Sequence, residues 1–574
     1  MKKRINNTIL YAVNNFGAAF GSIITGFFLI KTFGITESLF IIFVLSLIVL
    51  AGSIILQHFQ IKIDIKEDTS CLINKETLPV NKLYLLAFFS GFIFLQYEML
   101  MQRIVSLIFG NRIYVSSIIL FFIFTGMTYG SFLNKKWLQK YTPGKIITFC
   151  YSISVILISC LLLCFPVLFE NDYSQNSIFV TVIFCLFLCM IPASLLGMIF
   201  PLTLSIEPDE QNSNKINGKY IGYLYAVNTL ACLLGALITT YCIIKNFGTF
   251  NSFVLTGFIA FVPVFLFNKK KNFIIFFALL INLSVLLIPF IYKNSHNTII
   301  KDEDEYGQFK IIEIKKELYK VFNNCTELVF TYGAERTQYV QEMHAHFPML
   351  YSKKPEKILN IGTGYGITTG AFSLYDDVKE IDTIEIIPMM IKHASFFKKQ
   401  NYSYFDNPKV NIYIADGRQY LAKTKKKYDV ISINVSDPYL PGSSSLFSRE
   451  FYIKVKSRLT EKGIVCQHIF GFDNHSLIHQ FKEYFSYIKA IPAYENGITI
   501  IGSSTPFIEK PFFRNINLKH IKMTNERFSD LIRKGDMILV KHLTLKSEFT
   551  QEDDKPVLEY RTIPGKLGKL FSNM

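Results

Sequence analysis

The residues best suited to chemistry surround a glycine-rich turn in the second half of the chain. Gly362, Gly364 and Gly366 follow a short apolar strand and precede a sequence typical of a helix. Glycine allows positive φ angles and a close approach of a ligand to the backbone. About twenty residues later, an apolar strand at 381–384 ends on Glu385, whose carboxylate can accept two hydrogen bonds from a ribose. This spacing favours a nucleoside site, and the alternative is an ordinary tight turn between a strand and a helix.

Further polar groups follow other predicted strands. We expect strands near 358–361, 381–386, 410–414, 428–434, 463–469, 489–494 and 498–502, separated mostly by helices. This alternation predicts a mostly parallel sheet with helices on both faces, and ligands of such sheets bind at the carboxyl ends of the strands. Asp416, Gly417 and Asn434 fall at such ends. The predicted fold is an α/β Rossmann-like domain of the methyltransferase type, preceded by a small β subdomain.

The first half of the chain is strongly apolar. Half of the 574 residues are hydrophobic, 55 are Phe, and the mean hydropathy is +0.30, which predicts a multi-span α-helical membrane domain. From the length that a span requires, we expect about nine helices. They lie near 8–33, 38–57, 83–109, 113–134, 146–169, 177–206, 219–247, 251–268 and 273–292.

The charges predict how this half lies in a membrane. Connections rich in Lys and Arg separate every second pair of spans, which places the N-terminus in the cytoplasm. Positive loops facing anionic lipid also account for the net charge of +16 better than nucleic-acid binding does. Nine spans from a cytoplasmic N-terminus would put the polar half outside the cytoplasm, and the side of that half stays open.

Two segments of the apolar half repeat each other. Tyr11–Gly26 returns as Tyr225–Thr240 with Y-A-V-N in both copies, and the repeat extends over 11–57 and 225–268. Small residues alone would indicate close helix packing. The shared Y-A-V-N favours a duplication, as in transporter folds with parallel repeats.

Two ionisable side chains, Glu98 and Arg103, lie late in the third predicted span. Charged residues in a span usually face protein or a water-filled cavity. We expect either an ion pair between them, for which a separation of five residues is not ideal on a helix, or a role in transport.

The composition changes to charged and aromatic after the last predicted span. We therefore divide the chain into a membrane domain at 1–295, a small β subdomain at 296–335, an α/β domain at 336–510 and a C-terminal extension at 511–574. The ten cysteines lie mostly inside apolar runs and predict no disulfide framework.

The run from Tyr339 to Phe470 resembles the spermidine synthase family of aminopropyltransferases. Besides the glycine turn and Glu385, it shares Y-V-Q-E-M-H at 339–344, A-D-G at 415–417, Y-D-V-I-S-I-N-V-S-D-P at 428–438 and S-L-F-S-R-E-F-Y at 445–452. The chain is most similar to the bacterial membrane-fused branch, often called fused MFS/spermidine synthase. Its further matches to that branch are S-G-F-x-x-L-x-Y-E at 90–98, L-Y-A-x-N at 224–228 and D-D-x-P-V-L-E-Y at 553–560.

The resemblance implies roles for single residues. Glu385 would hold the ribose hydroxyls of a sulfonium nucleoside, and Asp416 would accept a hydrogen bond from the adenine amine. Asp437, with Tyr494, would bind the ammonium group of the acceptor. The donor pocket would also include Gln341, His344, Gly362, Gly364, Tyr365, Gly366 and Gly417.

The implied function is polyamine biosynthesis by a membrane-bound aminopropyltransferase. The donor would be decarboxylated S-adenosylmethionine, the acceptor a polyamine or another amine, and the location a bacterial cytoplasmic membrane. The resemblance is compatible with a homodimer, and we expect no nucleic acid as a partner. The donor is made inside the cell, so the orientation predicted by the loop charges conflicts with this function.

Two residues depart from the family pattern. The acid of the family's glycine turn is Tyr365 here, and the carboxylate that acts as general base is Asn434, which cannot take a proton at neutral pH. A pocket with fewer acids would suit S-adenosylmethionine itself, so a methyltransferase is an alternative. A catalytically decayed transporter or sensor of polyamines or nucleosides is another.

A metal site is considered and disfavoured. Cys466, His468, His475 and His479 have ligand-type side chains, and the last two lie one helical turn apart. Cys466 and His468, however, lie on a strand that matches the family, where no metal is expected, so we predict none.

Overall fold

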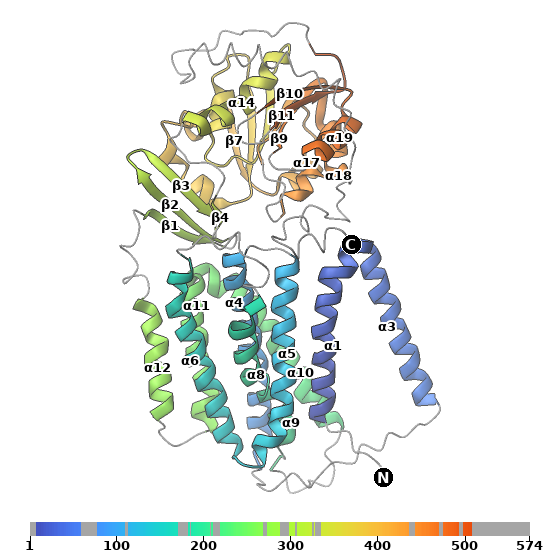
Figure 1. Ribbon diagram of the computed structural model, residues 1–574, viewed down its shortest axis with the longest axis vertical. Helices are drawn as coiled ribbons and strands as arrows, with labels where there is room; N and C mark the ends of the chain where they lie inside the picture. The colour runs from blue at the N-terminus through green and yellow to red at the C-terminus, as the bar shows by residue number, and fades with distance from the viewer. Residues whose placement is uncertain are drawn as a thin grey trace.

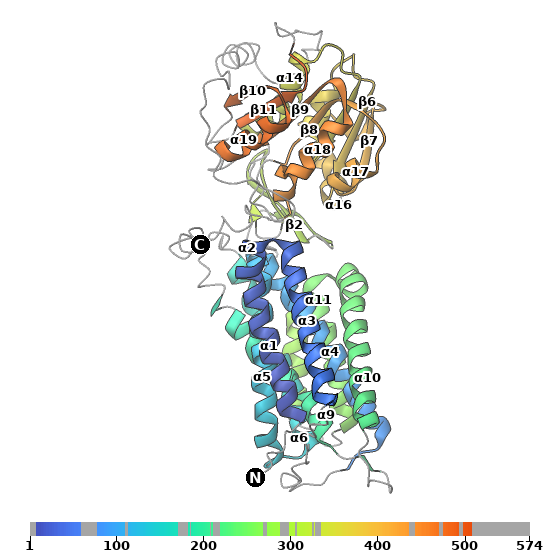
Figure 2. The ribbon, with the colours of Figure 1, turned by 90° about the vertical axis from the view of Figure 1, so that its right-hand side faces the viewer.

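The computed structural model describes residues 7–58, 77–109, 113–169, 182–183, 185–206, 208–209, 218–267, 273–287, 298–304, 307–323, 326–327, 335–435, 442–469, 474–492 and 498–507. A bundle of long helices forms one end of the molecule, and a mixed α/β domain forms the other (Figure 1). A small antiparallel sheet lies between them, as the view turned by 90° also shows (Figure 2). The predicted fold class is confirmed.

The helical half consists of long apolar helices with short π-helical and 3-10 segments. In chain order they are α1 (Asn7–Ile23), η1 (Ile24–Leu29), α2 (Ile30–Phe33), α3 (Ile35–His58), α4 (Val80–Phe109), α5 (Ile113–Leu138), α6 (Pro143–Phe169), η4 (Leu186–Met190), α8 (Ile191–Leu196), α9 (Ile199–Ser205), α10 (Gly218–Ile238), η5 (Thr239–Ile243), α11 (Ile244–Phe267), α12 (Phe273–Ser284) and η6 (Val285–Leu287).

Seven helical segments among the described residues are long and apolar enough to cross a membrane. Parts of several predicted spans lie outside the described residues, so this number does not test the expected nine. The predicted spans 219–247 and 251–268 fall in one helical run, Tyr220–Phe267, and the last predicted span corresponds to a shorter apolar helix, Phe273–Leu287. This run consists of two helices that meet at Gly248, whose φ of 72° is not helical, and the two predicted spans lie on either side of that kink.

The two copies of the sequence repeat have the same local structure. Each begins as an α-helix, passes into a π-helical segment (η1 and η5) and then reaches a glycine with positive φ, Gly34 at 85° and Gly248 at 72°. Helix α1 packs mainly against α5, and α10 packs mainly against α4. The two copies of the repeated sequence therefore have the same local structure, and the duplication stays a prediction.

The small sheet contains β1 (Thr298–Asp304), β2 (Gly307–Lys315), β3 (Leu318–Asn323) and β4 (Thr326–Glu327), all antiparallel in the order β1-β2-β3-β4. Its apolar face, with Phe309 and Val321, packs against Phe397 and Met390 of the α/β domain. The sheet is thus joined to the α/β domain by a shared hydrophobic core.

The other end of this sheet contacts the helical bundle. The Arg103 guanidinium lies 3.5 Å from a Glu303 carboxylate oxygen and donates to the Asp304 carbonyl. The backbone N–H of Thr249 donates to Glu303 at 3.0 Å. The pairing that we considered between Glu98 and Arg103 is therefore wrong. Arg103 lies near the end of α4, and its side chain reaches the β1 strand instead.

The large sheet has seven strands in the order β10-β11-β9-β8-β5-β6-β7. Its strands are β5 (Lys357–Ile361), β6 (Glu380–Glu385), β7 (Val410–Ile414), β8 (Tyr428–Ile433), β9 (Leu459–Ile469), β10 (Tyr487–Pro492) and β11 (Ile498–Ser503). Strands β5 to β9 pair in parallel, and β11 is antiparallel to both β9 and β10. The central strands are buried on both faces, which explains their continuous apolar runs.

Helices connect these strands and cover the sheet. They are α14 (Glu335–Tyr351), α15 (Ile367–Ser373), α16 (Pro388–Lys392), α17 (Gly417–Lys423), α18 (Arg449–Arg458) and α19 (Asn474–Tyr484), with 3-10 segments η7 (Ala394–Phe397), η8 (Tyr404–Asp406) and η9 (Ser444–Phe447). The carboxyl ends of β5, β6, β7 and β8 lie at one edge of the sheet, so the polar residues that follow these strands are brought together.

Candidate nucleoside-binding site

The glycine turn between β5 and α15 has the backbone that its sequence predicts. The φ angles of Gly362, Gly364 and Gly366 are 84°, 53° and 85°, a region that side chains disfavour. A Cβ at Gly366 would also lie 1.9 Å from the ring of Tyr404. The turn therefore requires glycine both for its conformation and for the space that the Tyr404 ring fills.

Buried hydroxyl groups beneath the turn hold it in place. Thr383 Oγ1 lies 2.6 Å from Thr363 Oγ1 and 2.9 Å from Thr369 Oγ1. Asn360 Nδ2 donates to Thr369 at 3.0 Å and to Thr383 at 3.3 Å. Because these side chains come from β5, β6, the turn and α15, their hydrogen bonds fix the turn relative to both strands.

Glu385, the last residue of β6, faces this turn. Its Oε2 accepts the backbone N–H of Gly364 at 2.8 Å, and its Oε1 accepts the backbone N–H of Ile387 at 3.0 Å. The N–H groups of Ile386 and Thr363 also interact with this carboxylate. Each oxygen makes only one well-formed hydrogen bond, and an ionised carboxylate oxygen can accept more than one. Two adjacent oxygens that can each accept another bond match the two vicinal hydroxyls of a ribose.

Asp416 has a structural contact of its own. Its Oδ1 accepts the backbone N–H groups of Arg418 and Gln419 at 2.8 and 3.0 Å and so caps the N-terminus of α17. Its Oδ2 has no hydrogen bond within the described part of the chain and stays available to a donor such as an adenine amine. A Cβ at the following Gly417 would lie 2.4 Å from the Ile361 side chain, which explains the glycine after Asp416.

A second cluster of buried polar groups lies where α14 contacts β8 and β9. Asn434 Nδ2 donates to Thr368 Oγ1 at 3.1 Å, and Thr368 Oγ1 donates to the Gln341 carbonyl at 2.8 Å. Gln341 Oε1 is buried without a well-formed hydrogen bond to any described residue, and the buried His344 ring has only a poorly formed contact with the Asn434 side chain. Buried polar atoms of this kind usually have a water or ligand as partner, so the cluster has the character of a binding site.

His468 on β9 belongs to this cluster, although sequence reasoning considered it only as a metal ligand. Its ring centroid lies 5.1 Å from that of His344, and its Nδ1 lies 3.0 Å from Thr499 Oγ1. The signal that could have found it is its position near the carboxyl end of a strand neighbouring β8. Among the described residues, no group of three metal-ligating side chains comes together.

Burial sets the charges of these groups. It lowers the pKa of His344 to about 4, with a small opposing effect from Asn434, and it lowers the pKa of His468 well below the usual value. Burial also raises the pKa of Glu385, which the backbone N–H groups of Ile387 and Gly364 partly counteract. At neutral pH both imidazoles are therefore uncharged, and they can accept a hydrogen bond or a proton.

Tyr365 is not placed where the resemblance puts it. Its ring is fully buried, with its centroid 4.2 Å from that of Phe397 and 6.2 Å from that of Phe309. The side chain thus joins the core between the small sheet and the α/β domain. Asp437 and Tyr494, expected at the acceptor, lie outside the described residues.

Comparisons with known proteins show what this half of the chain is similar to. Residues 337–511 match the family described as the spermine/spermidine synthase domain. Polyamine aminopropyltransferase 2 of Aquifex aeolicus is 24% identical over 404 residues, which cover 67% of this chain and 78% of that protein. This match is longer than the whole stretch after residue 336, so it extends into the apolar half.

Two further similarities concern the C-terminal half. The polyamine aminopropyltransferase of Alkaliphilus oremlandii is 28% identical over 218 residues, covering 36% of this chain and 75% of that protein. A crystal structure of spermidine synthase in complex with the transition state analogue AdoDATO aligns with a TM-score of 0.34 and 22% identity, over 41% of this chain and 88% of that one. The C-terminal half of this chain therefore carries a domain of the spermidine synthase/polyamine aminopropyltransferase family, preceded by many apolar helices.

Proposed function

We propose that this protein is an aminopropyltransferase-like enzyme of polyamine biosynthesis in a bacterial cytoplasmic membrane. It would transfer an aminopropyl group from decarboxylated S-adenosylmethionine to an amine. The observation that carries the proposal is the geometry of Glu385, whose two oxygens each make one well-formed hydrogen bond to the backbone beside a glycine turn and can accept another. The family match and the buried cluster around His344 support it.

The reaction is an in-line displacement. The lone pair of a neutral amine forms a bond to the carbon next to the sulfonium, the carbon–sulfur bond breaks, and its electron pair neutralises the sulfur. The products are methylthioadenosine and an alkylated ammonium group that must lose a proton. The protein has to align the two reactants and accept this proton.

Asn434 cannot be that acceptor, because a carboxamide is not basic at neutral pH. His344, beside it, is uncharged at pH 7 and can take a proton, but its pKa of about 4 makes it a weak base. General-base catalysis typically contributes about 10²–10⁴-fold. We therefore expect slow turnover, with alignment of the reactants as the main source of rate.

The test is to incubate the purified full-length protein with decarboxylated S-adenosylmethionine and a set of amines. The expected result is release of methylthioadenosine that depends on the amine. Failure to release it, together with the absence of nucleoside binding by calorimetry, would reject the proposal.

An Asn434→Asp variant tests the missing base. We expect a faster reaction, by up to about 10²–10⁴-fold, accompanied by a loss of stability. Asn434 donates a hydrogen bond to Thr368 Oγ1, and the Thr368 hydroxyl donates its own hydrogen to the Gln341 carbonyl. An aspartate at position 434 has no hydrogen to donate, so its carboxylate oxygen would face the Thr368 oxygen, which is also an acceptor. Such an unsatisfied contact costs about 1–3 kcal/mol. Asn407→Asp is a matched control, because Asn407 accepts the Lys409 N–H through an oxygen that aspartate keeps.

A methyltransferase that uses S-adenosylmethionine is the second candidate. Asn434 favours the methyltransferase, because the pocket around it lacks the carboxylate that would attract a polycationic acceptor. Release of S-adenosylhomocysteine from S-adenosylmethionine would support this candidate over the first. Continued inactivity of Asn434→Asp together with intact uptake of amines would instead support a transporter or sensor.

A further inference from the structure

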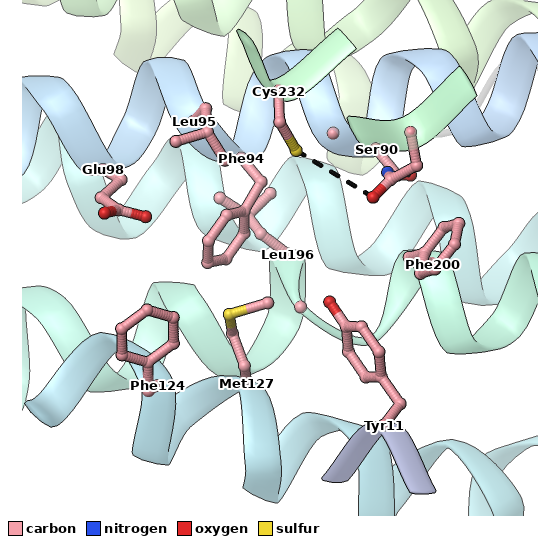
Figure 3. A pocket seen from close by; sticks show the side chains of 13 residues that line it. Tyr11, Ser90, Phe94, Leu95, Glu98, Phe124, Met127, Leu196, Phe200 and Cys232 are labelled. Carbon is pink, nitrogen blue, oxygen red and sulfur yellow. Dashed lines mark hydrogen bonds between the residues drawn. The ribbon is translucent and has the colours of Figure 1, made fainter. Parts of the chain in front are cut away.

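The helical half contains a cavity that the α/β chemistry does not use. It has a volume of about 270 Å³ and lies between α1, α4, α5, α8, α9 and α10 (Figure 3). Tyr11 and Asn228, which line it, come from the two copies of the sequence repeat. The cavity is therefore positioned where the duplicated helices approach the centre of the bundle.

One carboxylate lies at one end of this cavity. Glu98 is only 9% exposed, and its oxygens have no hydrogen bond or ion pair to any residue that the structure describes. Arg103, five residues further along α4, is engaged by Glu303 and Asp304. An acid without a partner in the apolar part of a bundle is costly and usually serves a function.

Aromatic side chains form much of the remaining wall. Phe94 and Phe124 lie near Glu98, and the Tyr11 hydroxyl points into the cavity (Figure 3). The rings of Tyr11 and Phe200 have centroids 5.7 Å apart. Aromatic faces attract cations through their ring quadrupole, and they also cover carbon chains.

The other polar groups of the wall are mostly occupied. Asn228 Nδ2 donates to the Ala87 carbonyl and to Ser90 Oγ, each at 3.0 Å, and Ser90 Oγ donates to the Ala87 carbonyl at 2.8 Å. A hard metal cation such as Ca²⁺ would require six or more oxygen ligands. An anion would require a positive partner, and the residues that line the cavity include no Lys, Arg or His.

We propose that this cavity binds a small organic ammonium ion, whose charge is neutralised by Glu98 and whose carbon chain is covered by the aromatic wall. The volume corresponds to roughly nine waters at about 30 Å³ each, so it admits an amine with a few carbon atoms and some of its water. The inference does not depend on the proposed transferase activity, because its residues all belong to the helical half.

The test is calorimetric titration of the full-length protein in lipid nanodiscs with n-butylammonium. The neutral control ligand is n-butanol, which has the same carbon chain, and the ion control is sodium chloride at equal ionic strength. We expect saturable binding of the ammonium alone. The variant Glu98→Gln should weaken it about 10–100-fold, as for loss of a charge-assisted hydrogen bond. Phe200→Leu should weaken it about 2–30-fold.

Glu37→Gln is the matched control, because Glu37 is an exposed acid on α3 that does not line the cavity. Its affinity for n-butylammonium should equal that of the unmodified protein. A second measurement follows the alkylation of Cys232, whose sulfur lies at the cavity wall (Figure 3). Bound ammonium should slow this alkylation, which gives a site-specific result even where Glu98→Gln fails to fold.

Three results would overturn the proposal. The first is equal binding of n-butanol and n-butylammonium, which would indicate a merely apolar cavity. The second is unchanged affinity in folded Glu98→Gln. The third is binding that leaves the alkylation rate of Cys232 unaffected, which would place the ligand elsewhere.

Discussion

Replacement of Glu385 by Gln tests the nucleoside site most directly. The carboxylate accepts well-formed hydrogen bonds from the N–H groups of Gly364 and Ile387, one on each oxygen, and each oxygen can accept another. A glutamine has one oxygen, so its amide nitrogen must face one of the two N–H groups. We expect a loss of stability of about 1–3 kcal/mol from the unsatisfied backbone donor.

The expected loss of nucleoside affinity is larger. Each hydrogen bond from a ribose hydroxyl to a charged acceptor contributes about 1.5–3 kcal/mol. Losing both therefore costs at least about 3 kcal/mol, which corresponds to an affinity lower by about 100-fold or more. Since burial raises the pKa of Glu385, the affinity should also fall as the pH decreases through that raised pKa, because the carboxylate becomes protonated.

Isothermal titration with adenosine and with 2′,3′-dideoxyadenosine separates binding from stability. The unmodified protein should prefer adenosine, and Glu385→Gln should bind both ligands equally weakly. Glu380→Gln is the matched control. Glu380 begins the same strand, and its carboxylate pairs with Lys426 at 2.6 Å at the opposite end. Its affinity for adenosine should remain within about twofold, the range expected of a substitution far from the ligand.

Either of two results would refute this reasoning. One is an unmodified protein that binds the two nucleosides equally, since Glu385 would then contact no ribose. The other is a Glu385→Gln variant that keeps the preference for adenosine.

Three other expectations follow from contacts and charges. Burial lowers the pKa of His344 to about 4 from its usual 6.5, so the unfolded chain binds this proton first as the pH falls, and His344 should contribute a loss of stability of about 3 kcal/mol between pH 6.5 and 4. The buried His346 and His468 act in the same direction. Thermal unfolding followed by near-UV circular dichroism measures the total, and His344→Gln should reduce it by the contribution of His344; an unchanged dependence would contradict this. Arg103→Gln should raise the rate of amide hydrogen exchange in β1, because Glu303 would lose its ion-pair partner. An unchanged exchange rate would show that this ion pair does not stabilise β1. A reporter fused after Met574 should be active outside the cytoplasm, because α2 lies at the α/β end of the bundle and α1 begins at the other (Figure 2), the end expected inside by the positive-inside rule. Since the donor is made inside the cell, this result would exclude a cytosolic transferase and would require the donor to reach the α/β domain through the helical half. A fluorescent cytoplasmic fusion would contradict the orientation and agree with a cytosolic enzyme.

Much of the architecture could be predicted from the sequence because it depends on local patterns. The strands of the large sheet lie close to their expected positions, since buried parallel strands require short continuous apolar runs. The turn at Gly362–Gly366 has its expected positive φ angles, since side chains disfavour that conformation. The two copies of the repeat likewise form similar helices, and the structure adds that each is followed by a glycine with positive φ.

The tertiary structure alone decided how side chains from distant segments meet. Arg103 contacts Glu303, which is 200 residues away in the sequence, because β1 of the small sheet lies next to the end of α4. Tyr365 turns into the core beside Phe397, whereas its position in the turn had placed it at the ligand. His468 joins His344 because β9 lies under α14.

The physical reason for this division is the range of the interactions. Backbone conformation and burial periodicity are set by a few neighbouring residues, so composition and spacing are sufficient to predict them. The direction of a side chain, the partner of a charge and the shape of a cavity depend on packing between elements that are remote in the chain. The glycine turn of this protein could therefore be recognised before its fold was known, whereas the cavity beside Glu98 exists only because α1, α4, α5 and α10 pack around it.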